Sequence, residues 1–233
     1  MRPSIRTYRF IISLAIAGLA GSGLQAQSLV WPSAVRVGTD LSRIGISAIS
    51  PVRKQYEINA DVDLYKYFIT CDFGNWTTNL SENDFDYSMS GWYLRSGFDY
   101  NFLFSDKDNQ VMFFGLRYCT SVFNETFGYR MVDPYYGPFT DTFSKSGSKA
   151  NWVEMNTGMK VHIWKGLYLG WTGRMKFGLK LTAPGRFVTY EIPGYGTTSK
   201  TTDWGINYSI YYRMAFRKKP PFPVKKIKPA GKN

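Results

Sequence analysis

Apolar and polar residues alternate along most of the chain beyond residue 33, and a period of two is the period of a β-strand. In residues 55–64, for example, Tyr56 and Ile58 share one face while Glu57 and Asp61 share the other. No segment shows the helical period over a comparable length. The alternation recurs in eight segments, which comprise residues 34–42, 55–64, 67–74, 92–101, 112–119, 152–163, 167–180 and 205–216.

Alternation alone leaves open which face of the strands points inward. A secreted soluble sandwich or a lipocalin-like barrel would bury the apolar face, whereas a transmembrane barrel would turn that face to lipid. The segments are about nine to thirteen residues long, which is the length of a tilted strand that crosses a bilayer and longer than an ordinary soluble strand. The polar face also mixes charged residues with mid-strand glycines, which is typical of a narrow interior. Both features favour the transmembrane barrel.

The connections between the segments alternate in length. Residues 65–66, 105–109 and 164–166 form short turns, whereas the other connections are long and comprise residues 44–54, 75–90, 121–150 and 182–203. Short turns at one end and long loops at the other are the layout of bacterial outer-membrane barrels, whose turns are periplasmic. The sequence therefore predicts an all-β protein, an eight-stranded antiparallel up-and-down transmembrane β-barrel over residues 27–216, located in the outer membrane of a Gram-negative cell.

The first 26 residues have the layout of a secretory signal peptide. Three arginines precede an apolar run over residues 10–20, and small and polar residues lead to Ala26. The alternative, an N-terminal anchor helix, is disfavoured because the apolar run is too short to span a bilayer. We expect cleavage before Gln27.

The formal net charge of +12 belongs mostly to the two ends of the chain. The expected signal peptide holds three basic residues and residues 217–233 hold seven, so ten of the 29 are terminal. The remaining nineteen nearly balance the 17 acidic residues. Export and this balance argue against nucleic acid as a partner.

The terminal tail is basic and rich in proline, with no acidic residue. Prolines favour extended polyproline geometry, so the tail could reach into the periplasm. It is either a solvated end or an electrostatic arm for an acidic periplasmic protein or for peptidoglycan carboxylates. Its cations include Arg217, Lys218, Lys219, Lys225, Lys226 and Lys228.

If the polar face points inward, the lumen holds nearly equal numbers of cations and anions. The cations are Arg36, Arg95, Arg117, Lys160, Arg174, Lys176, Lys180 and Arg213, and the anions are Asp40, Glu57, Asp61, Asp63, Asp72, Asp99 and Glu154. Because an unpaired buried charge costs several kcal/mol, we expect ion pairs across the lumen. Eight strands leave space for little more than side chains, so a wide diffusion pore is disfavoured.

Three short motifs carry a resemblance to a known family. Residues 36–42 (RVGTDLS), 56–58 (YEI) and 115–118 (GLRY) resemble those of small uncharacterised outer-membrane β-barrel proteins of Bacteroidota. The resemblance covers nearly the whole chain after the expected signal. It implies an integral barrel without a plug domain, in some members a subunit of a larger envelope assembly, and it implies no enzymatic activity.

The sequence has few residues of the types that serve as catalytic groups or metal ligands. The only histidine, His162, lies beside the 164–166 turn without a serine neighbour, so we expect it to be a rim side chain paired with an acid. With one histidine and two cysteines, we expect no metal site, no cofactor and no enzyme. Cys71 belongs to the outward face and Cys119 to the inward face, so both thiols should be free.

The connection over residues 121–150 is unusually aromatic for a loop. Aromatic residues on an exposed surface are typical of protein contacts, although these rings could instead pack on each other and on residues 182–203 as a lid. The candidate contact residues are Phe127, Tyr129, Tyr135, Tyr136 and Phe139.

Two classes of function stay open at this point. One is a non-enzymatic structural or accessory subunit of an outer-membrane protein complex, with the loops and tail as contacts. The other is a narrow transport or ligand-binding barrel.

Overall fold

A computed structural model describes residues 31–135, 137–181 and 187–217 of the chain. The expected signal peptide and the tail beyond Arg217 lie outside these described residues. The elements are β1 Ala34–Asp40, α2 Leu41–Ile49, β2 Arg53–Leu64, β3 Tyr67–Ser81, β4 Phe85–Asn101, β5 Val111–Asp133, β6 Gly137–Trp164, β7 Leu167–Lys180, β8 Glu191–Ile192, β9 Gly196–Thr197 and β10 Thr202–Ala215.

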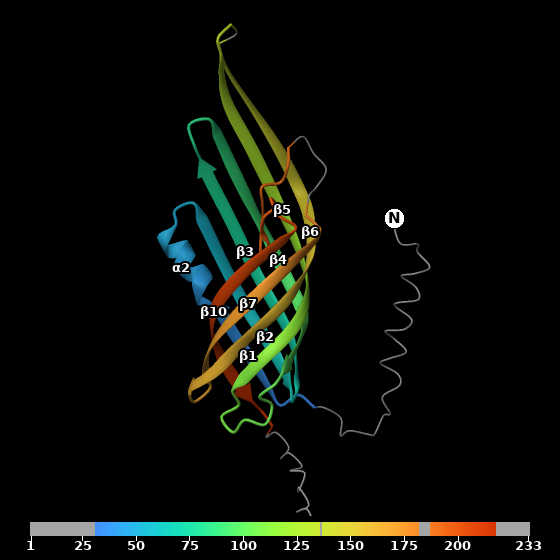
Figure 1. Cartoon of the computed structure of the whole chain (residues 1–233). Helices are drawn as coiled ribbons and strands as arrows, with labels where there is room; N and C mark the ends of the chain where they lie inside the picture. The colour runs from blue at the N-terminus through green and yellow to red at the C-terminus, as the bar shows by residue number, and fades with distance from the viewer. Residues whose placement is uncertain (1–30, 136, 182–186, 218–233) are drawn as a thin grey trace, which may run out of the picture. The chain divides into compact units, whose positions relative to one another are not determined.

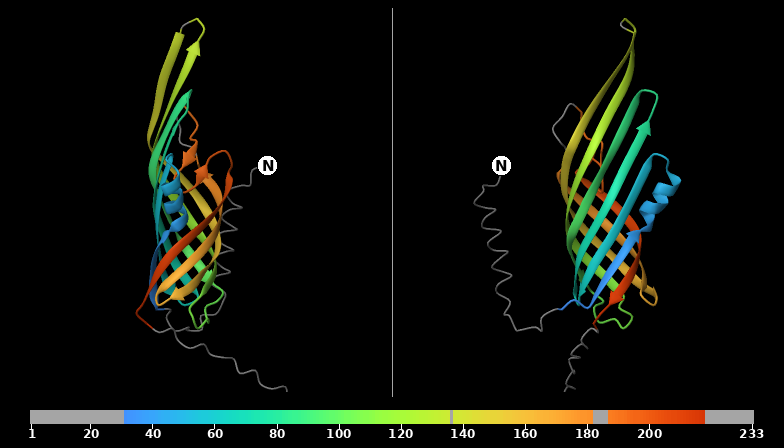
Figure 2. Two further views of the ribbon diagram at one scale, coloured as in Figure 1. Left: turned by 90° about the vertical axis from the view of Figure 1, so that its left-hand side faces the viewer. Right: turned by 180° about the vertical axis from the view of Figure 1, so that it is seen from behind.

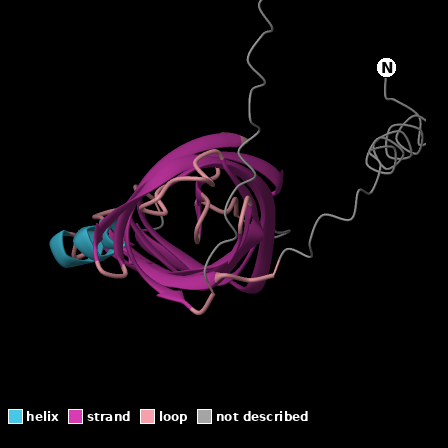
Figure 3. Ribbon diagram, turned by 90° about the horizontal axis from the view of Figure 1, so that it is seen from below, coloured by secondary structure: helices cyan, strands magenta, loops and turns pink. Residues whose placement is uncertain are grey.

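Eight of the strands close into a ring in the order β1-β10-β7-β6-β5-β4-β3-β2, and β8 and β9 form a separate two-stranded sheet (Figures 1 and 3). Every neighbouring pair in the ring is antiparallel. Closure pairs the edge strands β1 and β10, from Ala34 opposite Ala215 to Asp40 opposite Ser209. The eight-stranded antiparallel up-and-down barrel is confirmed.

The polar face of the ring points inward and the apolar face points outward. On β2, Glu57, Asn59 and Asp61 are buried, whereas Tyr56 and Ile58 have more than half of their surface exposed. A soluble barrel would have the opposite arrangement, because water would cover its outer wall. In the structure the charged parity of these strands is therefore the buried one.

The short connections lie at one end of the ring, where β1 begins and β10 ends (Figure 1). Tyr65 joins β2 to β3 with φ 78°, and Lys165 joins β6 to β7 with φ 50°, so both turns place a non-glycine residue in the left-handed region. Residues 102–110 connect β4 to β5 at the same end.

Two of the expected long loops are continuations of strands. The prediction of loops over 75–90 and 121–150 is wrong, because the β3–β4 hairpin runs on to Ser81 and Phe85 and the β5–β6 hairpin runs on to Asp133 and Gly137. Both hairpins rise beyond the ring (Figure 2). We call residues 75–91 and 123–149 the extension.

The faces of the strands exchange polarity where the ring passes into the extension. The inward face of the extension is apolar and packs as a core, and its members include Trp76, Tyr87, Met89 and Phe123, with Leu80, Phe85 and Phe127 against them. The outward face is polar, and its members include Asn79, Ser88, Ser90, Asn124, Thr126 and Ser144. The alternation therefore continues, but apolar side chains, which point outward in the ring, point inward in the extension.

The first strand is shorter than expected and a helix follows it. The sequence predicted a strand to Ser42 and no helix, but β1 ends at Asp40 and the nine residues of α2 come next. The Asp40 carboxylate accepts hydrogen bonds from the backbone N–H groups of Ser42 (2.8 Å) and Arg43 (3.3 Å), which is an N-cap. Over the described ranges, no helix has the length and apolar character needed to cross a membrane.

Candidate functional site

The lumen is organised around Glu57 of β2. Its carboxylate forms ion pairs with Arg95 of β4 (2.6 Å), Arg43 of α2 (2.7 Å) and Arg174 of β7 (3.1 Å). The hydroxyl of Tyr93 donates a further hydrogen bond to it at 2.5 Å. Glu57, Arg95 and Arg174 are fully enclosed, so their charges are balanced by each other and not by water.

A second carboxylate, Glu154 of β6, faces the same arginines from the opposite wall. It pairs with Arg95 at 3.0 Å and with Arg174 at 3.4 Å, and it accepts a hydrogen bond from the indole of Trp152 at 2.8 Å. Arg95 and Arg174 therefore bridge two acids that come from strands far apart in the sequence. These bridges cross the lumen and fix the strands relative to each other.

Arg117 of β5 extends the network. It pairs with Asp72 of β3 and, at 3.1 Å, with Asp99 of β4, while Arg174 reaches Asp72 at 3.3 Å. Space for these side chains comes from glycines on the inward face. A Cβ atom at Gly115 would lie 1.9 Å from the Asp99 carboxylate, which is closer than any real contact.

A separate group of charges lies nearer the short turns. Asp61 of β2 pairs with Arg36 of β1 at 2.7 Å and with Lys160 of β6 at 2.6 Å. The Arg36 guanidinium also stacks over the ring of Phe68, 4.2 Å from its centre. At the same end Arg213 lies 3.8 Å from Asp63, at the limit of an ion pair.

The structure brings together most of the residues predicted to form the lumen network, but Lys180 is an exception. Its side chain is exposed, because a register shift between Asn151 and Trp152 reverses the parity of β7 beyond Gly178. The network also contains a residue that the sequence did not indicate. This residue is Arg43, which pairs with Glu57. The sequence contained no sign of it because α2, the helix that turns Arg43 toward Glu57, was not predicted.

The described part of the connection between β7 and β10, drawn in orange, lies at the upper end of the ring (Figures 1 and 2). We call its described part, residues 187–201, the inner segment. Arg95 donates a hydrogen bond to the carbonyl oxygen of Gly194 (2.9 Å), and Lys176 donates one to that of Tyr195 (2.5 Å). Gly194 has φ +81°, and a Cβ atom there would lie 2.6 Å from the ring of Tyr93. The resemblance implied a barrel without a plug domain, but the inner segment fills the upper part of the lumen.

Aromatic and polar contacts hold the inner segment in place. The buried ring of Tyr195 meets Trp152 edge-on, with 5.6 Å between centroids, and burial raises the pKa of the Tyr195 hydroxyl to about 12. Higher up, Thr189 donates a hydrogen bond to Glu125 (2.7 Å), and Thr78 donates one to Glu191 (2.7 Å). The segment is therefore bonded to several strands of the wall.

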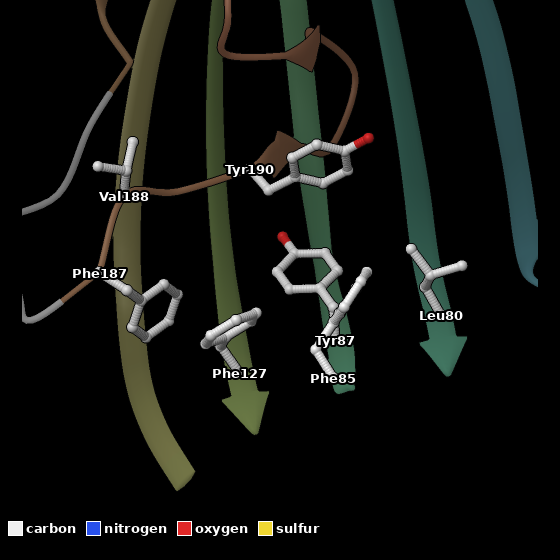
Figure 4. Close-up of a pocket in the computed structure, with 7 residues that line it drawn as sticks. All are labelled: Leu80, Phe85, Tyr87, Phe127, Phe187, Val188 and Tyr190. Carbon is white, nitrogen blue, oxygen red and sulfur yellow. The ribbon is translucent and has the colours of Figure 1, made fainter. Parts of the chain in front are cut away.

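An apolar pocket of about 470 Å³ opens between the inner segment and the extension (Figure 4). Phe127 lies between Phe85 (6.1 Å between centroids) and Phe187 (5.9 Å), and Tyr87 meets Tyr190 edge-on at 5.6 Å. Among the residues that the structure describes, no charged side chain lines it. The lining residues are Leu80, Phe85, Tyr87, Phe127, Phe187, Val188 and Tyr190.

The candidate contact residues fall into two groups. Phe127 and Tyr129 are half-buried on β5, because Phe127 packs on Phe187 and Tyr129 stacks on Phe143 at 6.1 Å, so they lie on a strand and not on an exposed loop. Tyr135 and Phe139 are 92% and 53% exposed at the end of the β5–β6 hairpin. Tyr136 lies outside the described residues, as do the tail lysines Lys218, Lys219, Lys225, Lys226 and Lys228, while Arg217 is exposed.

The reactive side chains considered for catalysis or metal binding are one histidine near the 164–166 turn and two cysteines. His162 shares a hydrogen bond with the carbonyl oxygen of Lys165 (2.5 Å), so the prediction of an acidic partner is wrong. Cys71 is exposed on the outer wall and Cys119 is buried, and both are free, as expected. In the part of the chain that the structure describes, no group of three or more potential ligands could hold a metal ion.

The chain belongs to the family described as "Domain of unknown function (DUF6048)", which matches residues 23–219. It is similar in structure to the crystal structure of Neisserial surface protein A (NspA), with 10% identity and a TM-score of 0.39 over 78% of this chain and 95% of that one. It is also similar to the N-terminal β-barrel domain of Pseudomonas aeruginosa OprF, with 8% identity and a TM-score of 0.29 over 78% and 98%. No curated protein matches the sequence.

Proposed function

Because membership of this family assigns no activity, we propose a function from the geometry of the barrel itself. The protein is an integral outer-membrane β-barrel that is closed to solutes and serves, without enzymatic activity, as a structural or accessory subunit of an outer-membrane protein complex. The observation that carries this proposal is the filled lumen, where paired charges and the inner segment occupy the space that a pore would need.

The membrane setting follows from the distribution of polarity on the outer wall. Outward residues of the ring such as Ile69, Phe98 and Leu116 are apolar and exposed, and they form a belt around charged and buried inward positions. Water would disfavour this belt, whereas lipid favours it. The short turns then face the periplasm and the extension faces the outside. The same proposal includes that the signal peptide expected over residues 1–26 directs export and that the protein comes from a member of the Bacteroidota.

The filled lumen argues against transport. A solute would have to separate pairs such as Glu57 with Arg95, and a buried ion that loses its partner is destabilised by about 3 to 5 kcal/mol. The cross-lumen bridges would have to break together, because Arg95 binds two acids and Arg174 binds three. The interior therefore serves the rigidity of the barrel.

The end of the β5–β6 hairpin is the surface best suited to a protein contact. Met131, Val132, Tyr135 and Phe139 are all exposed there, at the part of the hairpin farthest from the ring (Figure 2). Exposed apolar groups of this kind are typical of interfaces. The basic tail after Arg217 would provide a second, electrostatic contact on the periplasmic side.

Conductance of the purified protein in planar bilayers tests the closed lumen. The proposal predicts no steady current for the wild-type barrel. Arg95→Ala should be measured beside it, because removal of this bridge opens space at the centre of the lumen. Steady, ion-selective currents through the wild type would contradict the proposal and support a narrow transport barrel.

Photo-crosslinking in cells tests the subunit role. A benzophenone amino acid at Tyr135 should yield a crosslinked adduct with one protein partner, while the same residue at Ser88, which is exposed on the polar outer face of the extension, should yield none. Equal results at the two positions would remove the hairpin end as the contact surface. Loss of the adduct after removal of residues 218–233 would assign the main contact to the tail.

A second candidate function, ligand binding, is favoured by the pocket beside the inner segment. Ligand sites are concave, mostly apolar and often between 300 and 1,000 Å³ in volume, and the pocket of about 470 Å³ fits this description. Its carbon lining suits a small uncharged apolar molecule. Binding of N-phenyl-1-naphthylamine, followed by fluorescence, should fall in Phe127→Ser and persist in Phe143→Ser, whose ring does not line the pocket. Equal binding by both variants would locate the probe elsewhere.

A further inference from the structure

The wall of the barrel changes from strand to helix between β2 and β10. β1 pairs with β10 only up to Asp40 opposite Ser209, and with β2 only up to Thr39 opposite Ile58. Above these positions, β2 and β10 have no strand between them. α2 lies in this place, alongside both strands (Figures 1 and 2).

Side chains of α2 take over the hydrogen bonds that a longer β1 would have made. The hydroxyl of Ser42 accepts a hydrogen bond from the backbone N–H of Tyr208 on β10 (2.7 Å). The hydroxyl of Ser47 accepts one from the N–H of Gln55 on β2 (2.6 Å) and donates one to the carbonyl oxygen of the same residue (2.8 Å). An edge strand in lipid must satisfy its backbone groups in this way, because no water is available to do so.

The inner side of α2 takes part in the charge network of the lumen. Arg43 is buried, forms ion pairs with Glu57 (2.7 Å) and Asp40 (3.4 Å), and donates a hydrogen bond to the side-chain oxygen of Gln55 (2.8 Å). It also lies over the rings of Trp76 and Tyr93. This face of the helix is therefore equivalent to the inward face of a strand.

The outer side of α2 is apolar without interruption. At 100° per residue, Leu41, Ile44, Gly45, Ala48 and Ile49 lie on the side opposite Arg43, and the three large residues among them are exposed, Ile49 to 86%. A helix on a soluble protein carries its charges on the exposed side. In α2 the charge is inside and the apolar surface outside, as in the strands of the ring.

The apolar face of α2 continues the apolar belt of the neighbouring strands. Tyr56 and Ile58 flank it on β2, and Ile206 and Tyr208 flank it on β10, all of them exposed. We propose that α2 is a helical section of the membrane-facing wall, whose outer face contacts the acyl chains of the outer leaflet. This inference rests on the proposed outer-membrane setting. Continuity with the belt on both sides favours lipid over a protein occupant.

Nitroxide labelling of the full-length protein in lipid vesicles tests the proposal. In a Cys71→Ala background that retains the buried Cys119, single cysteines are introduced at Ile44, at Ile58 in the strand belt and at Ser88 on the polar face of the extension. Collisions with oxygen report lipid, and collisions with a water-soluble nickel chelate report water. The label at Ile44 should resemble the label at Ile58, with high oxygen and low nickel accessibility.

The outcomes separate the helix from the membrane setting. Water-like behaviour at Ile44 with lipid-like behaviour at Ile58 would overturn the inference and leave the outer-membrane barrel intact. Water-like behaviour at both would overturn the setting itself. Spin–spin broadening at Ile44 with low oxygen accessibility would mean that a second copy covers the helix, which also overturns the inference. Gly45→Cys provides an independent label, because a Cβ atom there meets nothing within 4 Å.

Discussion

Within single strands, the ring and the extension differ in which face is apolar. On β4, Trp92, Leu94 and Phe98 point outward in the ring while Arg95 and Asp99 point inward. In the extension, beginning two residues before Trp92 on the same strand, the outward side chains are Ser90 and Ser88 and the inward ones are Met89 and Tyr87. The backbone is continuous and its hydrogen bonds to β3 and β5 keep the same register throughout.

This contrast separates what the strand period determines from what the surroundings determine. A period of two places residues on two faces, but it does not say which face is buried. Lipid around the ring favours apolar residues outside, and water around the extension favours them inside. The position where the faces exchange polarity therefore marks the outer boundary of the membrane in our proposal.

The two regions also differ in how their interiors are held. The ring relies on charges that are paired across the lumen, as Glu57 is with three arginines. The extension relies on packed aromatic side chains such as Phe85 and Phe127, with Phe187 of the inner segment against them. Removal of one charge leaves the buried network with an excess of the opposite charge, whereas removal of one aromatic side chain leaves only a smaller core. Matched substitutions in the two regions should have effects of different size.

The largest effect is expected from Glu57→Gln. The amide cannot balance Arg43, Arg95 and Arg174, so the free energy of unfolding should fall by about 3 to 5 kcal/mol. Urea unfolding in detergent, followed by the heat-modifiable gel shift, provides the measurement. The matched control is Asp86→Asn, which breaks the exposed pair with Arg130 in the extension and should leave the midpoint unchanged. Equal midpoints for the two variants would show that the lumen charges are solvated.

The next effect concerns the outer faces. Leu116→Arg places a charge in the middle of the proposed lipid belt and should destabilise the folded barrel in vesicles by about 2 to 4 kcal/mol. Thr126→Arg lies on the outward face of the same strand but in the extension, where water can solvate the guanidinium, so it should be close to neutral. A neutral Leu116→Arg would remove the reason for placing this face in lipid.

A smaller and more local effect is expected from Phe127→Ala. The Phe127 side chain is half-buried between Phe85 and Phe187, so its removal should lower the free energy of unfolding by about 2 kcal/mol. The loss of stability should be confined to the extension. Hydrogen exchange should accelerate in β5 and β6 above Phe123 and stay slow in the ring. Thr126→Ala, on the opposite face, is the control. Faster exchange throughout the ring would show that the two regions unfold together.

The smallest effect is expected from reduction of the purified protein. Cys71 lies on the outer wall and Cys119 in the lumen, so no disulfide should join them and the intact mass should not change with reductant. A gain of two hydrogens would show that the assignment of the two faces is wrong for β3 or β5.

The sequence was sufficient to predict the ring but not the elements above it. In residues 55–64, for example, strand length, alternation and the turn at Tyr65 all point to the same structure. The sequence did not predict the continuation of β3 beyond Gly74. Up to Phe73 the apolar residues lie on the outward face, whereas Trp76 and Leu80 lie on the inward face, so the alternation stops there when it is followed along one face. The helix α2 was missed because Asp40 and Ser42 also fit the alternation of β1.

The charge network could be predicted in membership but not in its pairs. The parity of each strand indicates which charges enter the lumen. The contact of Arg174 on β7 with Glu57 on β2 depends instead on the stagger of strands that are not neighbours, and alternation contains no information on that stagger. The burial of Tyr195 likewise depends on the free volume beside Trp152, which exists only after the ring has closed.

The most direct test of the exchange of polarity is a cysteine scan along the outward face of β4. In the Cys71→Ala background, single cysteines at Ser88, Ser90, Leu94 and Phe98 are exposed in intact cells to a membrane-impermeant maleimide. Our account predicts labelling at Ser88 and Ser90, protection at Leu94 and Phe98, and labelling of all four after denaturation. Labelling of all four positions in intact cells, or protection at Ser88 with labelling at Phe98, would contradict it.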